Sequence, residues 1–467
     1  MQLYLSNTLT RQKDVFTPLV AGEAKIYTCG PTVYNYAHIG NLRSYIFPDL
    51  LKKLLLHDGY AVTHIINFTD VGHMTSDADD GDDKMEKAAA KLGKNAWELA
   101  AFYAEAFQQD LQHLNIAFPT RFTPATAYIQ EQIDLVKALE DKGLTYTIAD
   151  GVYYDTAKLP DYGKLARLDI EGLNEGERVS AEGKRNKTDF ALWKLSPTDV
   201  QRQMEWDSPW GKGFPGWHLE CTAMIFAELG ERIDIHTGGT DHIPVHHTNE
   251  IAQAEGAIGH PFVNYWLHGE FLVLDKAQRM GKSEGNFITL QTLLDEGFSA
   301  RAYRYLALGA HYKQFLTFSR DILKSAQTAY FKLKRLIQKL DDSPAGEAIA
   351  ADYAQRMLSA LHDDLNAPKT LGLLWEMVQD KAVGGAAKRA VITQIDSILS
   401  LSLQDFSDFP EDHVVVPEAV QALAAERWQY RLAKDFAASD RLRDELAAAG
   451  YSVKDSKDGY ELLPLDL

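Results

Sequence analysis

The sequence predicts an α/β protein built on a Rossmann-type parallel sheet. Residues 24–70 have the pattern strand, glycine turn, helix and strand, and residues 217–269 again alternate helices with strands. Such alternation is typical of a parallel sheet covered by helices. Between them, residues 145 to about 215 form short strands and turns rich in Gly, Pro, Trp and Asp. This middle run indicates an insertion between the two halves of one sheet.

The first half contains three predicted elements. The run AKIYTCGP alternates apolar and polar residues and stops at Gly30-Pro31, which predicts a strand. A helix is expected from about Ile39 to Gly59, because its leucines and Ile46 form one apolar stripe. The run YAVTHIINFTD predicts the next strand, and residues 91–142 have a helical pattern throughout.

The second half and the carboxyl-terminal third follow the same logic. We expect a helix after Trp217, a strand at RIDIH, a helix around Asn249 and a strand at FVNYWLHG. Residues 287–405 are predicted to be almost wholly helical. One long helix is expected from Pro417 to about Ala449, followed by a hairpin at YSVKDSKDGYELL.

Composition and charge exclude several classes of protein. Apolar residues make up 45% of the chain and charged residues 24%, which is the usage of a globular protein rather than a disordered or fibrous one. The sequence has no apolar run of the roughly 18 to 20 residues that a membrane span needs, and its start lacks the order of a signal peptide. We therefore expect a cytoplasmic protein without a membrane partner. Because the net charge is −18, any surface for nucleic acid must be local.

Two glycine-containing runs are candidates for phosphate binding. In CGPTVYNYAHIGN, at residues 29–41, a strand turns into a helix, so that the backbone and His38 can approach a phosphate. The run RMGKS, at residues 279–283, carries two cations around a glycine and can close over a triphosphate. Each run taken alone is also compatible with an ordinary surface turn.

The two cysteines of the chain, Cys29 and Cys221, suggest a metal site together with His246 and Glu250. The last two lie four residues apart in HHTNEIAQAEG, so one helical face presents both side chains. Two thiolates, one imidazole and one carboxylate make a four-ligand zinc set. The alternative is that both cysteines and the histidine are inert core residues. The nearby run HTGGTD ends a strand at the sheet edge where nucleotides bind in open α/β folds.

Several motifs resemble those of known proteins. The run HIGN resembles the HIGH signature of class I aminoacyl-tRNA synthetases, and RMGKS resembles their KMSKS loop. The runs PGWHLECTAM, DIHTGGTD and VHHTNEIAQ resemble the cysteinyl-tRNA synthetase family in particular. Four further runs, NTLTRQKDVFTPL, KRNKTDFALWK, HDDLNAPKTL and KDFAASDRLRDELAAAG, extend this resemblance over nearly the whole chain.

The resemblance implies a fold with five regions. The expected fold is the class I synthetase Rossmann-type parallel sheet with an inserted connective domain, a helical stem-contact region with a DALR-type bundle, and a small anticodon-binding domain. The two sheet halves are expected at residues 1–110 and 216–286, separated by the connective domain at 111–215. The helical region is expected at 287–405 and the anticodon-binding region at 406–467.

The resemblance also implies an activity and its partners. The expected reaction is ATP-dependent activation of L-cysteine to cysteinyl-adenylate, followed by transfer to tRNA(Cys), by a monomeric enzyme with one Zn²⁺ per chain and Mg²⁺ accompanying ATP. Zinc already softened by two thiolates prefers the thiolate of cysteine to the hydroxyl of serine. An apolar pocket alone rejects a near-isostere by only about 10², so direct metal recognition would explain the absence of an editing domain.

The resemblance carries roles over to individual residues. The implied metal ligands are Cys29, Cys221, His246 and Glu250. The residues matching the amino-acid pocket are Thr69, Trp217, His218, His236 and His247. The expected ATP-binding residues are His38, Gly40, Asn41, Gly238, Asp241, Arg279, Lys282 and Ser283, and the expected catalytic residues among them are His38 and Lys282.

The chain departs from the family signatures at three positions. Asn41 replaces the second histidine of HIGH, Arg279 replaces the first lysine of KMSKS, and Gly281 replaces its first serine. Asn41 still forms hydrogen bonds but carries no charge, which predicts reduced turnover. The acidic run at residues 76–83 is an addition to the pattern, and we interpret it as a solvated loop.

A basic stretch is the predicted contact with the tRNA acceptor side. Between residues 301 and 339 only one acid occurs, Asp321, against nine cations. The nine are Arg301, Arg304, Lys313, Arg320, Lys324, Lys332, Lys334, Arg335 and Lys339. In a chain of net charge −18, such a stretch is the expected footprint of a phosphate backbone. A basic face without a ligand is the alternative.

Two other functions are compatible with parts of this pattern. The first is a ligase that joins cysteine to an amino sugar in thiol biosynthesis, which shares the zinc site and both signature loops. It lacks the tRNA-binding carboxyl end that this chain has. The second is a noncatalytic, zinc-stabilised homologue that binds tRNA or nucleotides, which the altered signature positions favour and the retained His38 and Lys282 oppose.

Overall fold

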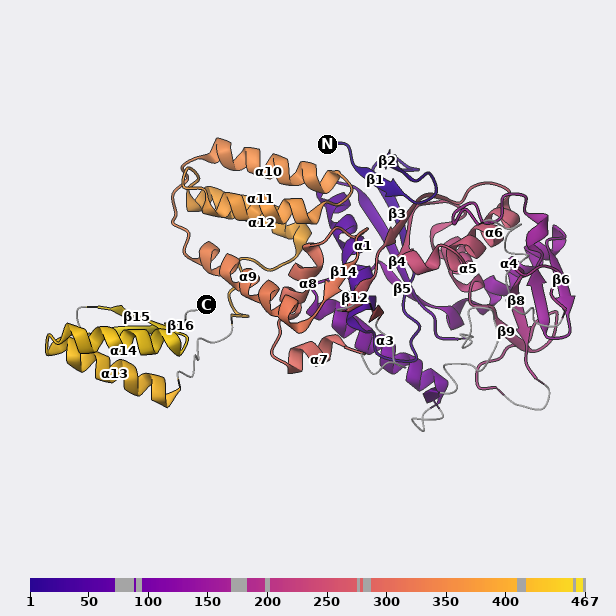
Figure 1. Cartoon of the computed structure of the whole chain (residues 1–467). Helices are drawn as coiled ribbons and strands as arrows, with labels where there is room; N and C mark the ends of the chain where they lie inside the picture. The colour runs from indigo at the N-terminus through magenta and orange to yellow at the C-terminus, as the bar shows by residue number, and fades with distance from the viewer. Residues whose placement is uncertain are drawn as a thin grey trace.

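A computed structural model describes most of the chain (Figure 1). The described residues are 1–71, 88–89, 95–168, 183–197, 202–274, 278–279, 287–409, 417–456 and 459–464. Within these ranges no helix is long and apolar enough to cross a membrane.

A five-stranded parallel sheet forms the centre of the molecule. Its strands are β3 (Glu23–Thr28), β4 (Ala61–Phe68), β5 (Arg121–Pro124), β10 (Ile233–Gly239) and β11 (Val263–Gly269), in the spatial order β11-β10-β3-β4-β5. All four neighbouring pairs are parallel. The chain therefore starts in the middle of the sheet, builds outward to one edge, and returns to build the other. This is the doubly wound order that the sequence predicts.

The point where the strand order reverses lies between β3 and β10. Their register pairs Ile235 with Ile26 and Thr237 with Thr28, so both strands end side by side. The N–H of Cys29 continues this pairing by donating to the carbonyl of Thr237 (3.1 Å). Open α/β sheets bind ligands at the carboxyl ends of strands at such a point.

Four helices follow or precede these strands. They are α1 (Ile39–His57), α3 (Ala96–His113), α5 (Leu219–Leu229) and α6 (His246–Ile258). Three of them, α1, α5 and α6, carry residues of the site. The buried stripe of α1 includes Leu51 and Leu54, which join Ile65 and Ile235 of the sheet in one hydrophobic core. This packing fixes the amino-terminal end of α1 against the carboxyl edge of the sheet.

The insertion forms its own antiparallel sheet. After the 3₁₀ turn η1 (Ala125–Tyr128) and α4 (Ile129–Asp141), strands β6 (Thr145–Ile148), β7 (Gly151–Tyr154), β8 (Phe190–Leu195) and β9 (Gly213–Pro215) pair in that order. A second 3₁₀ turn, η2 (Thr156–Lys158), follows β7. The short strands predicted for residues 145–215 are therefore present. The strands pack on α4 and α5 through a separate apolar cluster that includes Leu139, Trp193 and Leu219.

One predicted helical segment is wrong in part. The pattern of residues 91–142 predicts helix throughout, but β5 (Arg121–Pro124) interrupts it and adds the edge strand of the parallel sheet. Four residues are too few to show a strand period, and the pairing with β4 selects the strand. The parallel sheet therefore extends beyond residue 111, where the sequence places the start of the insertion.

The helical region after the sheet confirms the prediction for residues 287–405. Its helices are α7 (Leu290–Asp295), α8 (Ala300–Leu308), α9 (Arg320–Gln338), α10 (Glu347–His362), α11 (Ala367–Gln379) and α12 (Gly385–Leu399). Figure 1 shows α10, α11 and α12 stacked on the side of the parallel sheet away from the insertion. A small sheet of β12 (Leu272–Leu274), β13 (Gln278–Arg279) and β14 (Leu316–Phe318) joins this region to the parallel sheet. Near the amino terminus, β1 (Tyr4–Asn7) and β2 (Gln12–Val15) form a separate hairpin.

The carboxyl-terminal unit contains two helices instead of the single long helix predicted from Pro417 to Ala449. These are α13 (Glu418–Leu432) and α14 (Phe436–Ala448), followed by the expected hairpin of β15 (Tyr451–Asp455) and β16 (Tyr460–Pro464). The break lies at Lys434, whose φ is +61°, and at Asp435, whose side chain accepts a hydrogen bond from the N–H of Ala438. Asp435 is thus the N-cap of α14, and it ends the continuous helix that the sequence pattern predicts.

Candidate functional site

The turn after β3 brings the backbone close to β4. A Cβ atom on Gly30 would lie 1.5 Å from the carbonyl oxygen of Asn67, so only glycine fits here. The N–H of Gly30 donates to Oδ1 of Asn67 (2.7 Å). The close approach holds Cys29 and the following turn at the switch point of the sheet.

His38 occupies the amino-terminal cap of α1. Its Nδ1 accepts a hydrogen bond from the N–H of Asn41 (3.0 Å), and Oδ1 of Asn41 accepts from the N–H of His38 (3.3 Å). This reciprocal capping box gives Asn41 a structural role that does not need the charge of the histidine in HIGH. Because Nδ1 supplies a lone pair, the neutral ring carries its proton on Nε2. Burial lowers the pKa of His38, which favours this neutral form.

The end of β10 forms the other side of the switch point. A Cβ atom on Gly238 would lie 2.6 Å from Nδ1 of His242 and 2.7 Å from Cε1 of His247. Glycine at this position therefore allows two histidines to approach the strand end. Asp241 follows in the short 3₁₀ turn η4 (Thr240–His242), directly before α6.

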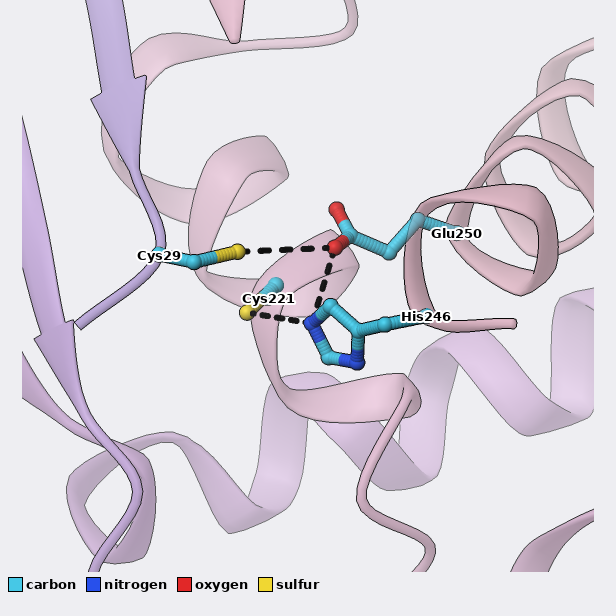
Figure 2. A group of neighbouring side chains, drawn as sticks. All are labelled: Cys29, Cys221, His246 and Glu250. Atoms are coloured by element: carbon cyan, nitrogen blue, oxygen red, sulfur yellow. Dashed lines mark hydrogen bonds and ion pairs between the residues drawn. The ribbon is translucent and has the colours of Figure 1, made fainter. Parts of the chain in front are cut away.

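Four predicted metal ligands converge beneath these two turns (Figure 2). Cys29 follows β3, Cys221 lies on α5, and His246 and Glu250 lie on one face of α6. Their donor atoms all lie within 4.8 Å of one another, and all four residues are buried. Nε2 of His246 lies 3.0 Å from Oε1 of Glu250 and 3.5 Å from Sγ of Cys221, and Sγ of Cys29 lies 3.9 Å from the same Oε1.

The four groups of this cluster shift one another's pKa values in different directions. Burial opposes ionisation of Cys221, but hydrogen bonds from Cys29 and His246 lower its pKa to about 6. The pKa of Cys29 moves in the opposite direction, because burial and the neighbouring Cys221 disfavour a second thiolate. Against its own burial, His246 has a pKa raised to about 10 by Glu250 and Cys221. The pKa of Glu250 is lowered, despite its burial, by His236 and His246.

A second, overlapping donor set consists of Cys29, His236, His247 and Glu250. Cys29, Cys221 and His246 line the open cleft, whereas His236 and His247 do not. The first set, with Cys221 and His246, is therefore better placed to hold a metal that also contacts a ligand entering from the cleft. It is also the set that the sequence predicts.

Three histidines predicted for the amino-acid pocket lie behind the donor cluster instead of lining the cleft. Nδ1 of His218 lies 3.0 Å from Nδ1 of His246, and Nε2 of His236 lies 2.8 Å from Oε2 of Glu250. Nε2 of His247 lies 3.2 Å from Sγ of Cys29. Side chains in such positions orient metal ligands and set their tautomers.

The remaining described candidates surround one cleft with a volume of about 680 Å³. The predicted residues that line it are Cys29, His38, Asn41, Thr69, Trp217, Cys221, Gly238, Asp241 and His246. Gly40 lies within the first turn of α1, where a Cβ atom would be 3.0 Å from the ring of His38. The structure thus brings the HIGN turn, the HTGGTD turn and the donor cluster into one site.

Part of the predicted site lies outside the described residues. This applies to Lys282, Ser283 and Gly281 of the RMGKS run and to the acidic run at residues 76–83. The backbone of Arg279 is described in β13, which pairs with β12. The roles predicted for these residues stay predictions.

The structure also shows site residues that the sequence did not single out. Tyr34, Tyr36 and Tyr45 line the cleft, as do His242 and Phe287. The ring of Phe287 contacts that of His38 at 5.6 Å between centroids. His242 follows directly on HTGGTD and was recognisable from that position, whereas Phe287 is brought to α1 only by tertiary pairing of residues 288 and 289 with residues 39 and 38.

The basic stretch of residues 301–339 does not form one continuous surface. Arg304 is fully buried and pairs with Asp49 (2.6 Å). Lys334 is also fully buried and pairs with Asp408. These two cations stabilise the fold and are not part of the predicted tRNA surface. Charges such as Lys332 and Lys339 are exposed.

Two family models match the chain. "tRNA synthetases class I (C) catalytic domain" matches residues 15–328, and "Cysteinyl-tRNA ligase anticodon binding domain" matches residues 413–461. The LeuRS of Agrobacterium radiobacter K84, solved in a ternary complex with tRNA and LeuAMS, has a similar fold with a TM-score of 0.61 at 9% identity, covering 83% of this chain and 84% of that one. Mycobacterium tuberculosis methionyl-tRNA synthetase, solved with methionyl-adenylate, gives a TM-score of 0.55 at 16% identity, with 81% and 88% covered. The fold and the switch-point site are those of a class I aminoacyl-tRNA synthetase.

Two curated relatives show which family within this class the chain belongs to. "Cysteine--tRNA ligase 1" of Burkholderia lata is 49% identical over 462 residues, covering 99% of this chain and 97% of the relative. "Cysteine--tRNA ligase" of Treponema denticola is 42% identical over 483 residues, covering 97% and 98%. The chain belongs to the cysteinyl-tRNA synthetase family.

Proposed function

We propose that this chain activates L-cysteine with ATP to cysteinyl-adenylate and then transfers the cysteinyl group to the 3′ end of tRNA(Cys). One observation carries the proposal: two thiols and an imidazole line the same cleft that His38 and the HTGGTD turn border, and the buried carboxylate of Glu250 completes their donor set. Membership of the family and the match to its anticodon-binding domain support tRNA as the acceptor.

The donor cluster fits one Zn²⁺. Zinc bonds of about 2.0 to 2.3 Å place tetrahedral ligands roughly 3.3 to 3.8 Å apart. The separations of 3.0, 3.5 and 3.9 Å among His246, Cys221, Cys29 and Glu250 surround this range. When bound, zinc supplies a soft Lewis acid that prefers a thiolate to a hydroxyl. His218 and His236 hold the outer atoms of His246 and Glu250, and so orient both ligands.

The residues of the cleft have distinct roles in the proposed reaction. The Nε2–H of His38 donates to the phosphate oxygens on which negative charge develops as pyrophosphate leaves. Lys282 supplies a cation to the same group, and Mg²⁺ accompanies the ATP. Thr69 and Trp217 border the donor cluster and contact the amino acid. We further propose that the enzyme acts as a cytoplasmic monomer.

The decisive experiment is cysteine-dependent exchange of pyrophosphate into ATP, followed by transfer assays with two acceptors. We expect exchange with L-cysteine and transfer to tRNA(Cys). Exchange with transfer only to an amino sugar would replace the proposal by the thiol-biosynthesis ligase. Binding of tRNA without any exchange would identify a noncatalytic homologue.

A further inference from the structure

An aromatic cluster lies where the cleft meets α3. It consists of Tyr36, which lines the cleft, and of Phe102 and Tyr103 on the first half of α3. The ring of Tyr36 lies 6.0 Å from that of Phe102 and 5.1 Å from that of Tyr103, and the two rings of α3 lie 5.1 Å apart. All three contacts are edge-to-face, the geometry that stabilises aromatic pairs.

The exposure of the three rings divides them into an anchor and a platform. Tyr103 is only 7% exposed and belongs to the main hydrophobic core. Tyr36 is 45% exposed and Phe102 is 42% exposed. The buried tyrosine therefore holds two large aromatic side chains in place while part of each faces solvent. We call Tyr36 and Phe102 the aromatic platform.

In the transfer step of the proposed function, the acceptor end of the tRNA enters the cleft beside this platform. The terminal adenosine of the tRNA must enter the cleft to reach the adenylate, and the unpaired nucleotides before it must lie along the mouth of the cleft. A base that leaves its stack regains stacking energy on an aromatic side chain, whatever its identity. Tyr36 lines the cleft, so the platform is within reach of a nucleotide at its mouth.

The charges around the platform indicate how a nucleotide would lie on it. Glu98 and Glu105 are exposed on α3, four residues before and three residues after Phe102. Residues at these spacings are neighbours on a helix surface. Their carboxylates repel phosphate, so the platform suits the face of a base, with the sugar-phosphate backbone turned away from α3.

We propose that Tyr36 and Phe102 form a stacking platform for an unpaired base of the tRNA acceptor end during transfer. This inference rests on the proposed function and goes beyond it by assigning a binding surface for the acceptor nucleotides.

Phe102 provides the test, because it does not line the cleft. In Phe102→Ala we expect cysteine-dependent pyrophosphate exchange to stay at the wild-type rate. Loss of one base–aromatic stack should lower the efficiency of transfer to tRNA(Cys) by about 5- to 100-fold. Phe102→Tyr keeps the ring and should transfer normally. Phe118→Ala is the matched control, since Phe118 is 39% exposed but precedes the amino end of β5, whereas Tyr36 follows the carboxyl end of the parallel strand β3.

A spectroscopic readout separates stacking from a general loss of affinity. A tRNA(Cys) carrying 2-aminopurine at an unpaired position before the terminal adenosine should be quenched on binding the wild-type enzyme and less quenched by Phe102→Ala. Wild-type transfer and quenching in Phe102→Ala would overturn the proposal, as would equal losses in exchange and transfer. Self-association of the wild type that this substitution abolishes would assign the platform to a second copy instead. A wild type without any exchange would refute the proposed function itself.

Discussion

The two nitrogen atoms of His38 make separable predictions for stability and catalysis. Nδ1 caps α1 by accepting from the N–H of Asn41 at 3.0 Å, and Nε2 carries the proton that we assign to the phosphate. Asparagine places its amide near the position of Nδ1, and glutamine places its amide near that of Nε2. The variants His38→Asn and His38→Gln therefore each retain one function and lose the other.

The two variants should differ in the free energy of unfolding and, in the opposite order, in the rate of adenylation. His38→Asn keeps a good N-cap residue, so its free energy of unfolding should equal that of the wild type, whereas His38→Gln should lose about 1 kcal/mol. The loss of one preorganised donor to developing charge lowers a rate by about 10²- to 10³-fold. We expect that loss in the adenylation rate of His38→Asn and a smaller one in His38→Gln.

Urea unfolding and single-turnover adenylation measure the two quantities on the same preparations. The variants should rank in opposite orders in the two assays. If His38→Asn formed adenylate as fast as His38→Gln or faster, Nε2 would not be the catalytic donor. Equal stability of the two variants would show that the capping bond contributes nothing.

Three further variants test the packing and the charge distribution. Burial raises the pKa of Asp110 to about 7, so folding favours its protonated form and the stability of the protein falls as pH rises from about 4 to 7. Asp110→Asn should therefore raise the free energy of unfolding by on the order of 1 to 4 kcal/mol at pH 8 and leave it unchanged at pH 4, as denaturant titrations at both values would show. Replacing the exposed Lys332 and Lys339 by alanine should flatten the salt dependence of tRNA affinity without slowing pyrophosphate exchange, and an unchanged slope would remove α9 from the tRNA surface. Lys334→Ala should instead destabilise the protein by about 3 kcal/mol, measured by urea unfolding, because the carboxylate of Asp408 loses its cation. A stability equal to that of wild type would contradict the structural role of this ion pair.

The sequence predicted those parts of the site that local patterns encode. The spacing of His246 and Glu250 places both on one helical face, and the structure brings Cys29 and Cys221 to them. The glycine turns after β3 and β10 lie at the switch point, as the alternation of strands and helices predicts. Local pattern was sufficient there because each residue lies at a fixed position relative to the end of its element.

Tertiary context decided the features that were missed. The strand β5 is too short for a period and exists through its pairing with β4. The burial of Arg304 and Lys334 depends on Asp49 and Asp408, which lie far away in the sequence, so counting charges could not distinguish them from surface cations. The break at Asp435 is different, because an aspartate N-cap is a local signal that the sequence itself contains.

X-ray absorption at the zinc edge tests the central proposal most directly, because it counts sulfur neighbours of the metal. Enzyme purified with zinc should show two sulfur neighbours, from Cys29 and Cys221. With saturating L-cysteine the number should rise to three, and with L-serine it should stay at two. A count that L-cysteine leaves unchanged would contradict recognition of the substrate thiol by the metal at this site.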